Sequence, residues 1–424
     1  MKNRGKILYV LAALLLLGFG FFLWEYVNYA EAWATYPGAP HIFGIATVTD
    51  RTGKTLTHTQ DALLRQATIH WLGDKQGNIR APAAEIQRPY DFLNGLYSYG
   101  GFHPKIRLTL QAELQKAALS ALGEYRGTVA IINYETGEIL CAVSAPTFDP
   151  EKPGGTVESM YLNRFTQGLY TPGSIFKLVT LAAALEENPS LVEQAFLCTG
   201  TLNFGENKVT CPYPHGRQTL GDAFANSCNC VFGKLATDLG GERLAHYAQK
   251  FGVLESLSFD GITTARGKYE MASSVDLAWS GAGQFTTLIN PCSFLTFVCA
   301  VASGGEGVNP YVVSRVEEGR KTLYSANRTH RERILSAETA RKLQVYLRAN
   351  VRDKYENANF AGLTVCAKTG TAEVGSAKPN AMLCGFLQDG RYPVAFLICV
   401  EEGGYGEKTC IPIAGKLLKM LVDS

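Results

Sequence analysis

Residues 171–180 have the sequence TPGSIFKLVT, in which a Pro-Gly turn leads directly into an apolar segment. The run from 175 to 185 is apolar on nearly every side, which predicts a buried helix. Ser174 then stands at the helix N-terminus, where unpaired backbone N–H groups favour developing negative charge. Lys177 follows one turn later on the same face. Because burial lowers the pKa of a lysine, its neutral amine can accept the serine proton, so the pair predicts a nucleophile and its base.

The alternative is an N-cap serine beside a solvated lysine, since serine is a common N-cap residue. Chance alone gives the S-x-x-K pattern about once or twice in a chain of this length. The pattern occurs once here, and the helix after it offers Lys177 no polar face. Both facts favour a site.

A second motif is Ser227-Cys228-Asn229, which interrupts two helical runs at 220–224 and 231–239. Its residues are poor helix formers and predict a tight connection. Ser227 could relay a proton to a leaving amine, and Asn229 could bind a substrate amide. The alternative is an ordinary helix–helix loop, since residues 325–327 also fit S-x-N in a plain polar turn.

The third motif, Lys368-Thr369-Gly370, follows a strand-like run. The lysine and the threonine hydroxyl can hold a substrate carboxylate, and Gly370 lets another backbone approach closely. The N–H of Thr371, together with that of Ser174, could form an oxyanion hole; losing one such donor costs about 3 kcal/mol. The alternative is an exposed edge strand protected by a lysine.

The order of the remaining elements predicts the fold class. An amphipathic helix is expected at 110–122, helices fill most of 160–300, and a last helix covers 411–422. Strands are expected at 127–133 and 138–144, and again at 362–371, 382–387 and 392–401. Strands at both ends with helices between them predict an α+β domain whose two ends share one antiparallel sheet around a helical cluster.

The N-terminus predicts a membrane anchor. Lys2, Arg4 and Lys6 precede the uncharged run 7–24, which holds twelve Ile, Leu, Val or Phe side chains. Those twelve favour insertion by about 4 to 7 kcal/mol, and as a helix the run covers about 27 Å of a ~30 Å hydrocarbon core. The positive-inside rule places the rest of the chain outside the cytoplasm. The alternative is a cleaved signal peptide, for which small residues near 30–34 offer a site.

These segments give a domain plan for a single-pass protein of the cell membrane with an extracytoplasmic C-terminal domain. Residues 1–6 form a cytoplasmic tail and 7–27 the transmembrane anchor. Residues 28–105 form a short pedestal broken by prolines and glycines, and 106–424 form the main domain. The pedestal carries no candidate catalytic constellation.

Composition excludes some functions. Lys+Arg 40 against Asp+Glu 38 leaves a net charge of +2, too little for a nucleic-acid partner. Of the eleven cysteines, Cys198 and Cys211 flank a hairpin-like segment and could bridge if their Cα atoms lie close enough. Neither C-x-x-C nor H-E-x-x-H occurs, so no metal is expected. His215 has no obvious acid partner and is interpreted as structural, and residues 281–284 could line the cleft or form a plain turn.

Together the three motifs make residues 106–424 resemble the penicillin-binding transpeptidases, whose signature is S-x-x-K, an S-x-N triplet and K-T-G. Residues 136–140 and 368–373 are typical of the membrane-anchored monofunctional group. The resemblance implies acylation of Ser174 by a D-Ala-D-Ala stem peptide, release of D-alanine and transfer to an amine, without a cofactor. It implies covalent trapping by β-lactam antibiotics. It also implies peptidoglycan stem peptides and lipid-linked precursor strands as partners, together with a membrane glycosyltransferase.

Two departures from the family pattern are Cys228, where related β-lactamases have Asp, and a short pedestal. Competing hypotheses are a D,D-carboxypeptidase or a β-lactamase-type hydrolase, and a non-catalytic cell-wall scaffold. No E-x-x-L-N-like run, as needed for class A deacylation, lies between Asn229 and Lys368. An inert scaffold would tolerate the loss of Lys177 or Ser227, and both are present.

Overall fold

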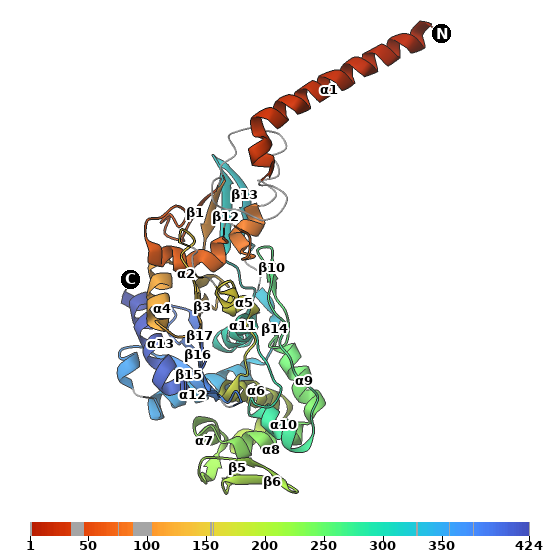
Figure 1. The fold of residues 1–424 in the computed structure, drawn as a ribbon. Coiled ribbons are helices and arrows are strands. Elements are labelled where there is room, and N and C mark those ends of the chain that lie inside the picture. The colour runs from red at the N-terminus through yellow and green to blue at the C-terminus, as the bar shows by residue number, and fades with distance from the viewer. Residues whose placement is uncertain are drawn as a thin grey trace.

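The structure, a computed structural model, describes residues 2–34, 46–74, 76–87, 104–152, 155, 157–327, 330–355, 357–375 and 377–423. Its centre is a five-stranded antiparallel sheet of order β15-β16-β17-β3-β4. The strands are β3 (Gly127–Asn133), β4 (Ile139–Ala145), β15 (Val365–Ala372), β16 (Asn380–Leu387) and β17 (Val394–Val400). Since β17 pairs with β3, the two ends of the domain share one sheet, as predicted (Figure 1). The strand that carries the K-T-G motif, β15, lies at one edge.

Helices cover both faces of this sheet. On one face pack α4 (Ala112–Leu122) and α13 (Gly406–Asp423), and on the other packs α11 (Pro291–Ala302). Successive strand residues alternate between the two faces, so that Ala395 joins the α11 side and Phe396 the α13 side. This period of two is what a sheet buried on both faces requires.

The helices that carry S-x-x-K and S-x-N lie beyond or beside the β15 edge, together with several others (Figure 1). This group is α6 (Lys177–Glu187), α7 (Leu220–Ala225), α8 (Asn229–Leu239), α9 (Gly241–Lys250), α10 (Ser274–Gly281) and α12 (Ala337–Asp353). The short helix α5 (Arg164–Gln167) instead contacts β3 and β4, near the opposite edge of the sheet. Small two-stranded pairs decorate the domain: β5 (Ala195–Cys198) with β8 (Gly216–Thr219), β6 (Thr201–Phe204) with β7 (Asn207–Thr210), β9 (Ser258–Phe259) with β10 (Ile262–Thr263), and β11 (Glu306–Val308) with β14 (His330–Arg333).

The predicted pedestal is joined to the domain by a second sheet, β1-β2-β12-β13. In this sheet β1 (Thr47–Thr49) runs parallel to β2 (Lys105–Leu108), which pairs with β12 (Val313–Glu318) and through it with β13 (Lys321–Ser325). The expected boundary between 105 and 106 therefore falls inside β2, and the division into domains stays a prediction. Residues 35–45, 75 and 88–103 of the segment lie outside the described residues.

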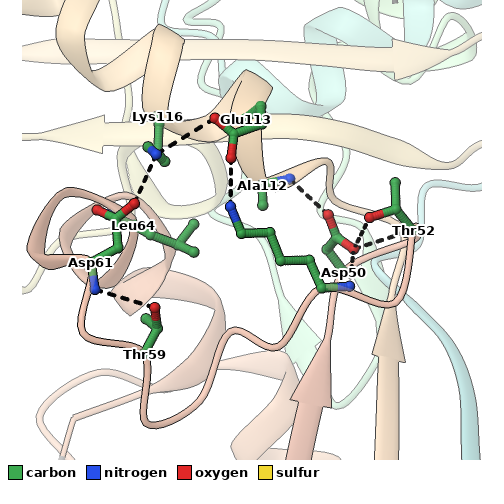
Figure 2. A network of polar contacts seen from close by, with 9 residues as sticks. Asp50, Thr52, Thr59, Asp61, Leu64, Ala112, Glu113 and Lys116 are labelled. Atoms are coloured by element: carbon green, nitrogen blue, oxygen red, sulfur yellow. Dashed lines mark hydrogen bonds and ion pairs between the residues drawn. The ribbon is translucent and has the colours of Figure 1, made fainter.

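A polar network also joins the turn after β1 to α4 (Figure 2). The buried carboxylate of Asp50 accepts bonds from its own turn and, at 3.0 Å, from the N–H of Ala112 at the start of α4. Nearby, Asp61 caps α2 (Ala62–Leu72) and binds Lys116 of α4 at 2.7 Å. Asp50 therefore supplies the cap that Gln111, which makes no side-chain cap bond, does not.

The N-terminal helix α1 (Lys2–Ala34) includes one segment, Gly5–Asn28, that is long and apolar enough to cross a membrane. The predicted span 7–27 lies within it. All eleven cysteines fall in the described residues and are free thiols, so Cys198 and Cys211 do not bridge in this structure.

Candidate active site

Ser174 lies in a 3-10 turn, Gly173–Phe176, that leads into α6. The predicted helix therefore begins two residues later than expected, at Lys177, and its residues 177–185 are all buried. Gly173 has a φ of +55°, and its N–H donates to the carbonyl of Gly283 at 2.8 Å. Residues 281–284, at the end of α10, thus hold the turn that carries Ser174 through this backbone hydrogen bond.

Lys177 contacts three of the other predicted site residues. Its Nζ lies 2.8 Å from Ser174 Oγ, 2.8 Å from Asn229 Oδ1, 3.1 Å from the carbonyl oxygen of Ser227 and 3.2 Å from Ser227 Oγ. The side chain is 0% exposed. Burial, followed by the nearby charge of Lys368, lowers the pKa of Lys177 to about 7. A large share of this lysine is therefore uncharged near neutral pH.

The partners of Lys177 decide where its lone pair points. An uncharged amine has two N–H donors and one lone pair. The Ser227 carbonyl and Asn229 Oδ1 can only accept, so they take the two N–H groups. The Asn229 amide is oriented by its Nδ2, which donates to the carbonyl of Thr210 at 2.8 Å. The lone pair is left for a hydroxyl, and Ser174 Oγ is the nearer one.

Ser227 lies in the connection between α7 and α8, as the helix breakers predicted. Its φ of +51° is rare for a residue with a side chain. This tight turn presents both the hydroxyl and the carbonyl of Ser227 to Lys177. Asn229 opens α8 directly after it.

Lys368 reaches the same place from β15. Its Nζ donates to Ser227 Oγ at 3.3 Å and to the carbonyl of Thr369 at 2.9 Å, and it lies 5.9 Å from the centre of the Phe224 ring. Burial lowers the pKa of Lys368 to about 8, so it remains mostly charged at pH 7. At neutral pH the Ser227 hydroxyl therefore lies between Lys368, which is mostly charged, and Lys177, of which a large share is uncharged.

The rest of the K-T-G strand packs against the nucleophile turn. A Cβ on Gly370 would lie 3.0 Å from the carbonyl oxygen of Pro172, and one on Gly173 only 2.6 Å from that of Thr371. These contacts bring Thr371 beside the Ser174 turn, while the pairing of their N–H groups in an oxyanion hole stays a prediction. Glycine at both positions permits the close approach.

Thr369 has a partner that no sequence motif indicated. The hydroxyl of Tyr355, just beyond α12, accepts a bond from the Thr369 N–H at 2.9 Å and lies 3.2 Å from its hydroxyl. Burial raises the pKa of Tyr355 to about 12, so it remains a phenol. A lone tyrosine after an amphipathic helix carries no local signal, because only the fold brings it to β15.

The structure thus brings together all eight predicted site residues, which come from the 3-10 turn and start of α6, the α7–α8 connection and start of α8, and β15. Three bond directly through Lys177, and Lys368 joins them through Ser227. The arrangement combines a hydroxyl nucleophile, an uncharged amine within bonding distance and a second ammonium group. Such a set can form and resolve an acyl-enzyme on a carbonyl substrate that carries an anionic group.

Comparisons with known proteins agree with this geometry. Residues 127–419 match the family described as the penicillin binding protein transpeptidase domain. The peptidoglycan D,D-transpeptidase PbpA of Mycolicibacterium smegmatis is 29% identical over 353 residues, which cover 75% of this chain and 71% of that protein. Stage V sporulation protein D of Bacillus subtilis is 28% identical over 78% of this chain, and the match spans about half of that protein, 53%.

The fold recurs in solved structures. Penicillin-binding protein A of M. tuberculosis, as a ceftriaxone acyl-enzyme complex, has a TM-score of 0.78 and 20% identity, covering 91% of this chain and 99% of that one. The D,D-transpeptidase domain of a peptidoglycan glycosyltransferase from Eggerthella lenta has a TM-score of 0.77 and 24% identity, covering 89% and 98%. Because the family model matches more than half of this chain, the chain belongs to the penicillin-binding protein transpeptidases.

Proposed function

We propose that this protein is a serine-type peptidoglycan D,D-transpeptidase with Ser174 as its nucleophile. The uncharged amine of Lys177 takes the Ser174 proton as Oγ attacks the carbonyl of the penultimate D-alanine of a stem peptide. The proton then passes through Ser227 to the leaving amine, and D-alanine departs as the ester forms. An acceptor amine attacks that ester, gives up its proton by the same route and regenerates the Ser174 hydroxyl.

The observation that carries this proposal is the 2.8 Å contact between Lys177 Nζ and Ser174 Oγ. It joins a fully buried amine, with a pKa of about 7, to a half-buried hydroxyl. Because the Ser227 carbonyl and Asn229 Oδ1 take the N–H groups of Lys177, its lone pair can accept the Ser174 proton without rearrangement of the site. General-base catalysis of this kind contributes roughly 10²–10⁴-fold to a rate.

The remaining predicted residues hold the substrate in this scheme. Lys368 and the Thr369 hydroxyl bind the terminal carboxylate of the stem peptide. Asn229 binds a substrate amide. The backbone N–H groups of Ser174 and Thr371 stabilise the oxyanion, and the Gly370 backbone lets the substrate lie along the edge of β15.

The setting of the reaction follows from the N-terminal helix. We place α1 across the cell membrane, with the catalytic domain on the extracytoplasmic side, because three basic residues precede the apolar segment. There the enzyme would meet peptidoglycan strands and their lipid-linked precursors. A membrane glycosyltransferase, which makes the strands to be crosslinked, is the proposed partner.

Acyl transfer and hydrolysis are separated by one assay on the full-length chain in detergent. The chain is given a peptide ending in D-Ala-D-Ala and an amine acceptor, and the products are resolved by mass spectrometry. We expect a peptide joined to the acceptor, and a stable adduct with benzylpenicillin. Hydrolysed peptide alone, or rapid penicillin turnover, would indicate the carboxypeptidase or β-lactamase alternative.

Two variants and one control variant test the assignment of residues in the same assay. Ser174→Ala should abolish labelling by fluorescent penicillin. Ser227→Ala should slow labelling, whereas Ser325→Ala, in the second S-x-N triplet on β13, should label as wild type does. Persistent labelling of Ser174→Ala, with thermal unfolding unchanged, would refute Ser174 as the nucleophile.

A further inference from the structure

Next to the S-x-N loop, and including its Cys228, lies a group of thiol and imidazole side chains that the proposed mechanism does not use. It consists of Cys198, Cys211, His215 and Cys228, whose ligand atoms all lie within 4.8 Å of one another. We call these four residues the thiol–imidazole cluster. They come from the end of β5, the turn after β7, the residue before β8 and the N-cap of α8. Cys198 and Cys228 are buried, and Cys211 and His215 are partly exposed.

We propose that the thiol–imidazole cluster binds one zinc ion in tetrahedral Cys3His coordination. With Zn–S bonds of about 2.3 Å and Zn–N bonds of about 2.0–2.1 Å, a tetrahedron places its sulfur atoms about 3.8 Å apart and sulfur and nitrogen about 3.6 Å apart. Here Cys211 Sγ lies 3.7 Å from Cys228 Sγ, and Cys198 Sγ lies 3.4 Å from His215 Nδ1. These two edges agree with the tetrahedral values to within about 0.2 Å, and the four ligand atoms all lie within 4.8 Å of one another. Three thiolates with one imidazole are a ligand set that zinc prefers.

Backbone pairing brings the four residues of the thiol–imidazole cluster together. Pairing of β5 with β8 sets Cys198 opposite Gly216, which brings His215 alongside. The Cys211 N–H donates to the carbonyl of Gly200 at 2.9 Å, which ties the turn after β7 to the end of β5. Four short strands in separate pairs have little core of their own, and a metal is a common means of holding so small a unit together.

Two simpler interpretations fit less well. A disulfide needs its sulfur atoms about 2.05 Å apart, whereas the close pairs here, Cys211–Cys228 and Cys211–Cys230, are at 3.7 and 3.5 Å. Small core residues would be expected to lie singly among apolar neighbours, as Cys141 does on β4. In the thiol–imidazole cluster the neighbours are other metal-ligand atoms. Cys230 is the one further thiol close enough to replace a ligand.

The zinc would affect catalysis by holding the loop that carries Ser227 and Asn229 in place. Cys228 separates Ser227 from Asn229, so its sulfur would anchor the loop that presents both to Lys177. Cys211 follows Thr210, whose carbonyl orients the Asn229 amide. These residues are positioning residues, and this second part of the inference rests on the proposed function, while metal binding does not.

Metal content is the direct test. The full-length chain is purified in detergent under reducing conditions, without chelator, and is analysed by inductively coupled plasma mass spectrometry. We expect about one zinc per chain. Cys211→Ser and His215→Ala should each lose most of it, and Cys292→Ala, a thiol outside the cluster, should keep it. Less than about a tenth of a zinc per wild-type chain after zinc is resupplied, or full zinc in the Cys211→Ser/His215→Ala double variant, would overturn the proposal.

A second measurement covers variants that fail to fold. The wild-type chain is loaded with Co²⁺ in place of zinc, and its absorption is recorded. Tetrahedral thiolate coordination gives strong visible d–d bands and a sulfur-to-cobalt charge-transfer band, which we expect. Weak bands of an octahedral site, or a disulfide among Cys198, Cys211 and Cys228 in the mapped peptides, would contradict the assignment.

The positioning role has its own readout. Removal of zinc from wild type should lower the rate of penicillin acylation by about tenfold or more, and zinc should restore it. His215→Ala should show the same loss without rescue, and Cys292→Ala should show neither. If metal content is as expected but acylation does not depend on zinc, the positioning role fails and the metal site remains. If Ser174→Ala still labels, the proposed function fails without affecting the metal content.

Discussion

The pH dependence of acylation follows directly from the two buried lysines. Lys177 must be uncharged to accept the Ser174 proton, and its pKa lies near 7. Its uncharged fraction therefore rises with pH, from about a tenth at pH 6 to about nine tenths at pH 8. Lys368 must be charged to hold a carboxylate, and its pKa lies near 8. Its charged fraction falls from about nine tenths at pH 7 to about a tenth at pH 9.

The product of these fractions is a bell-shaped profile. It peaks between the two pKa values and falls about sixfold from pH 7.5 to either pH 6 or pH 9. The position of the acid limb is set first by the burial of Lys177, which lowers its pKa, and then by the charged groups that face it. Lys368 lowers its pKa by charge repulsion, and Cys211 and Cys228 act in the opposite direction.

The assay is the second-order rate constant of fluorescent-penicillin labelling of the full-length chain between pH 5.5 and 9.5. The reaction of Ser174→Ala is subtracted to correct for chemical labelling. Lys368→Met should react at a lower overall rate and lose the alkaline limb. Its acid limb should move to higher pH, because the charge of Lys368 no longer lowers the pKa of Lys177. A rate that is flat from pH 6 to 8, or that rises with a midpoint near the ordinary lysine pKa of about 10.4, would refute the role of Lys177.

Three further substitutions test the supports of the site and the fold, each with thermal unfolding of the detergent-solubilised chain. Asp50→Ala removes a buried acceptor of four hydrogen bonds and should lower the free energy of unfolding by about 2–3 kcal/mol. The N-cap substitution Asp61→Ala should lower it by only about 1 kcal/mol, and equal losses would contradict the account of α4. Gly173→Ala should slow acylation on the order of tenfold, because its Cβ would lie 2.6 Å from the carbonyl oxygen of Thr371 on β15. Gly375→Ala should leave the rate unchanged, because Gly375 has the same φ of +55° but no atom within 4 Å of the added Cβ. Tyr355→Phe leaves an N–H of β15 without its acceptor and should cost about 1–3 kcal/mol, with KM rising more than kcat falls; unchanged stability would show that another group takes that bond.

Much of the fold was predictable because its signals are local. The strand-like runs at 127–133, 362–371 and 392–401 predicted strands of the central sheet, and the poor helix formers around Ser227 predicted the α7–α8 connection. The predicted sharing of one sheet by both ends of the domain is confirmed by the pairing of β17 with β3. One boundary moved at Lys177, where a 3-10 turn precedes the helix. The strand pair β5–β8 was not predicted and lies, like β6–β7, within the stretch 160–300 that was expected to be mostly helical.

What could not be predicted depends on tertiary position. Tyr355 reaches Thr369 because α12 packs beside β15, and no pattern near residue 355 encodes that contact. The thiol–imidazole cluster was hidden for a related reason. Its ligands lie in the spacing C-x12-C-x3-H-x12-C, which no short motif covers, so His215 was interpreted as structural and no metal was expected. Only the pairing of β5 with β8 brings the first and third ligands together.

The account depends most on proton transfer from Ser174 to Lys177. Its most direct test is peptide mapping by mass spectrometry after brief exposure of the full-length chain to benzylpenicillin, with wild type and Lys177→Met side by side. We predict one adduct in wild type, on the peptide that carries Ser174, and almost none in Lys177→Met over the same time. An adduct on another residue, or equal acylation of both proteins, would contradict the account.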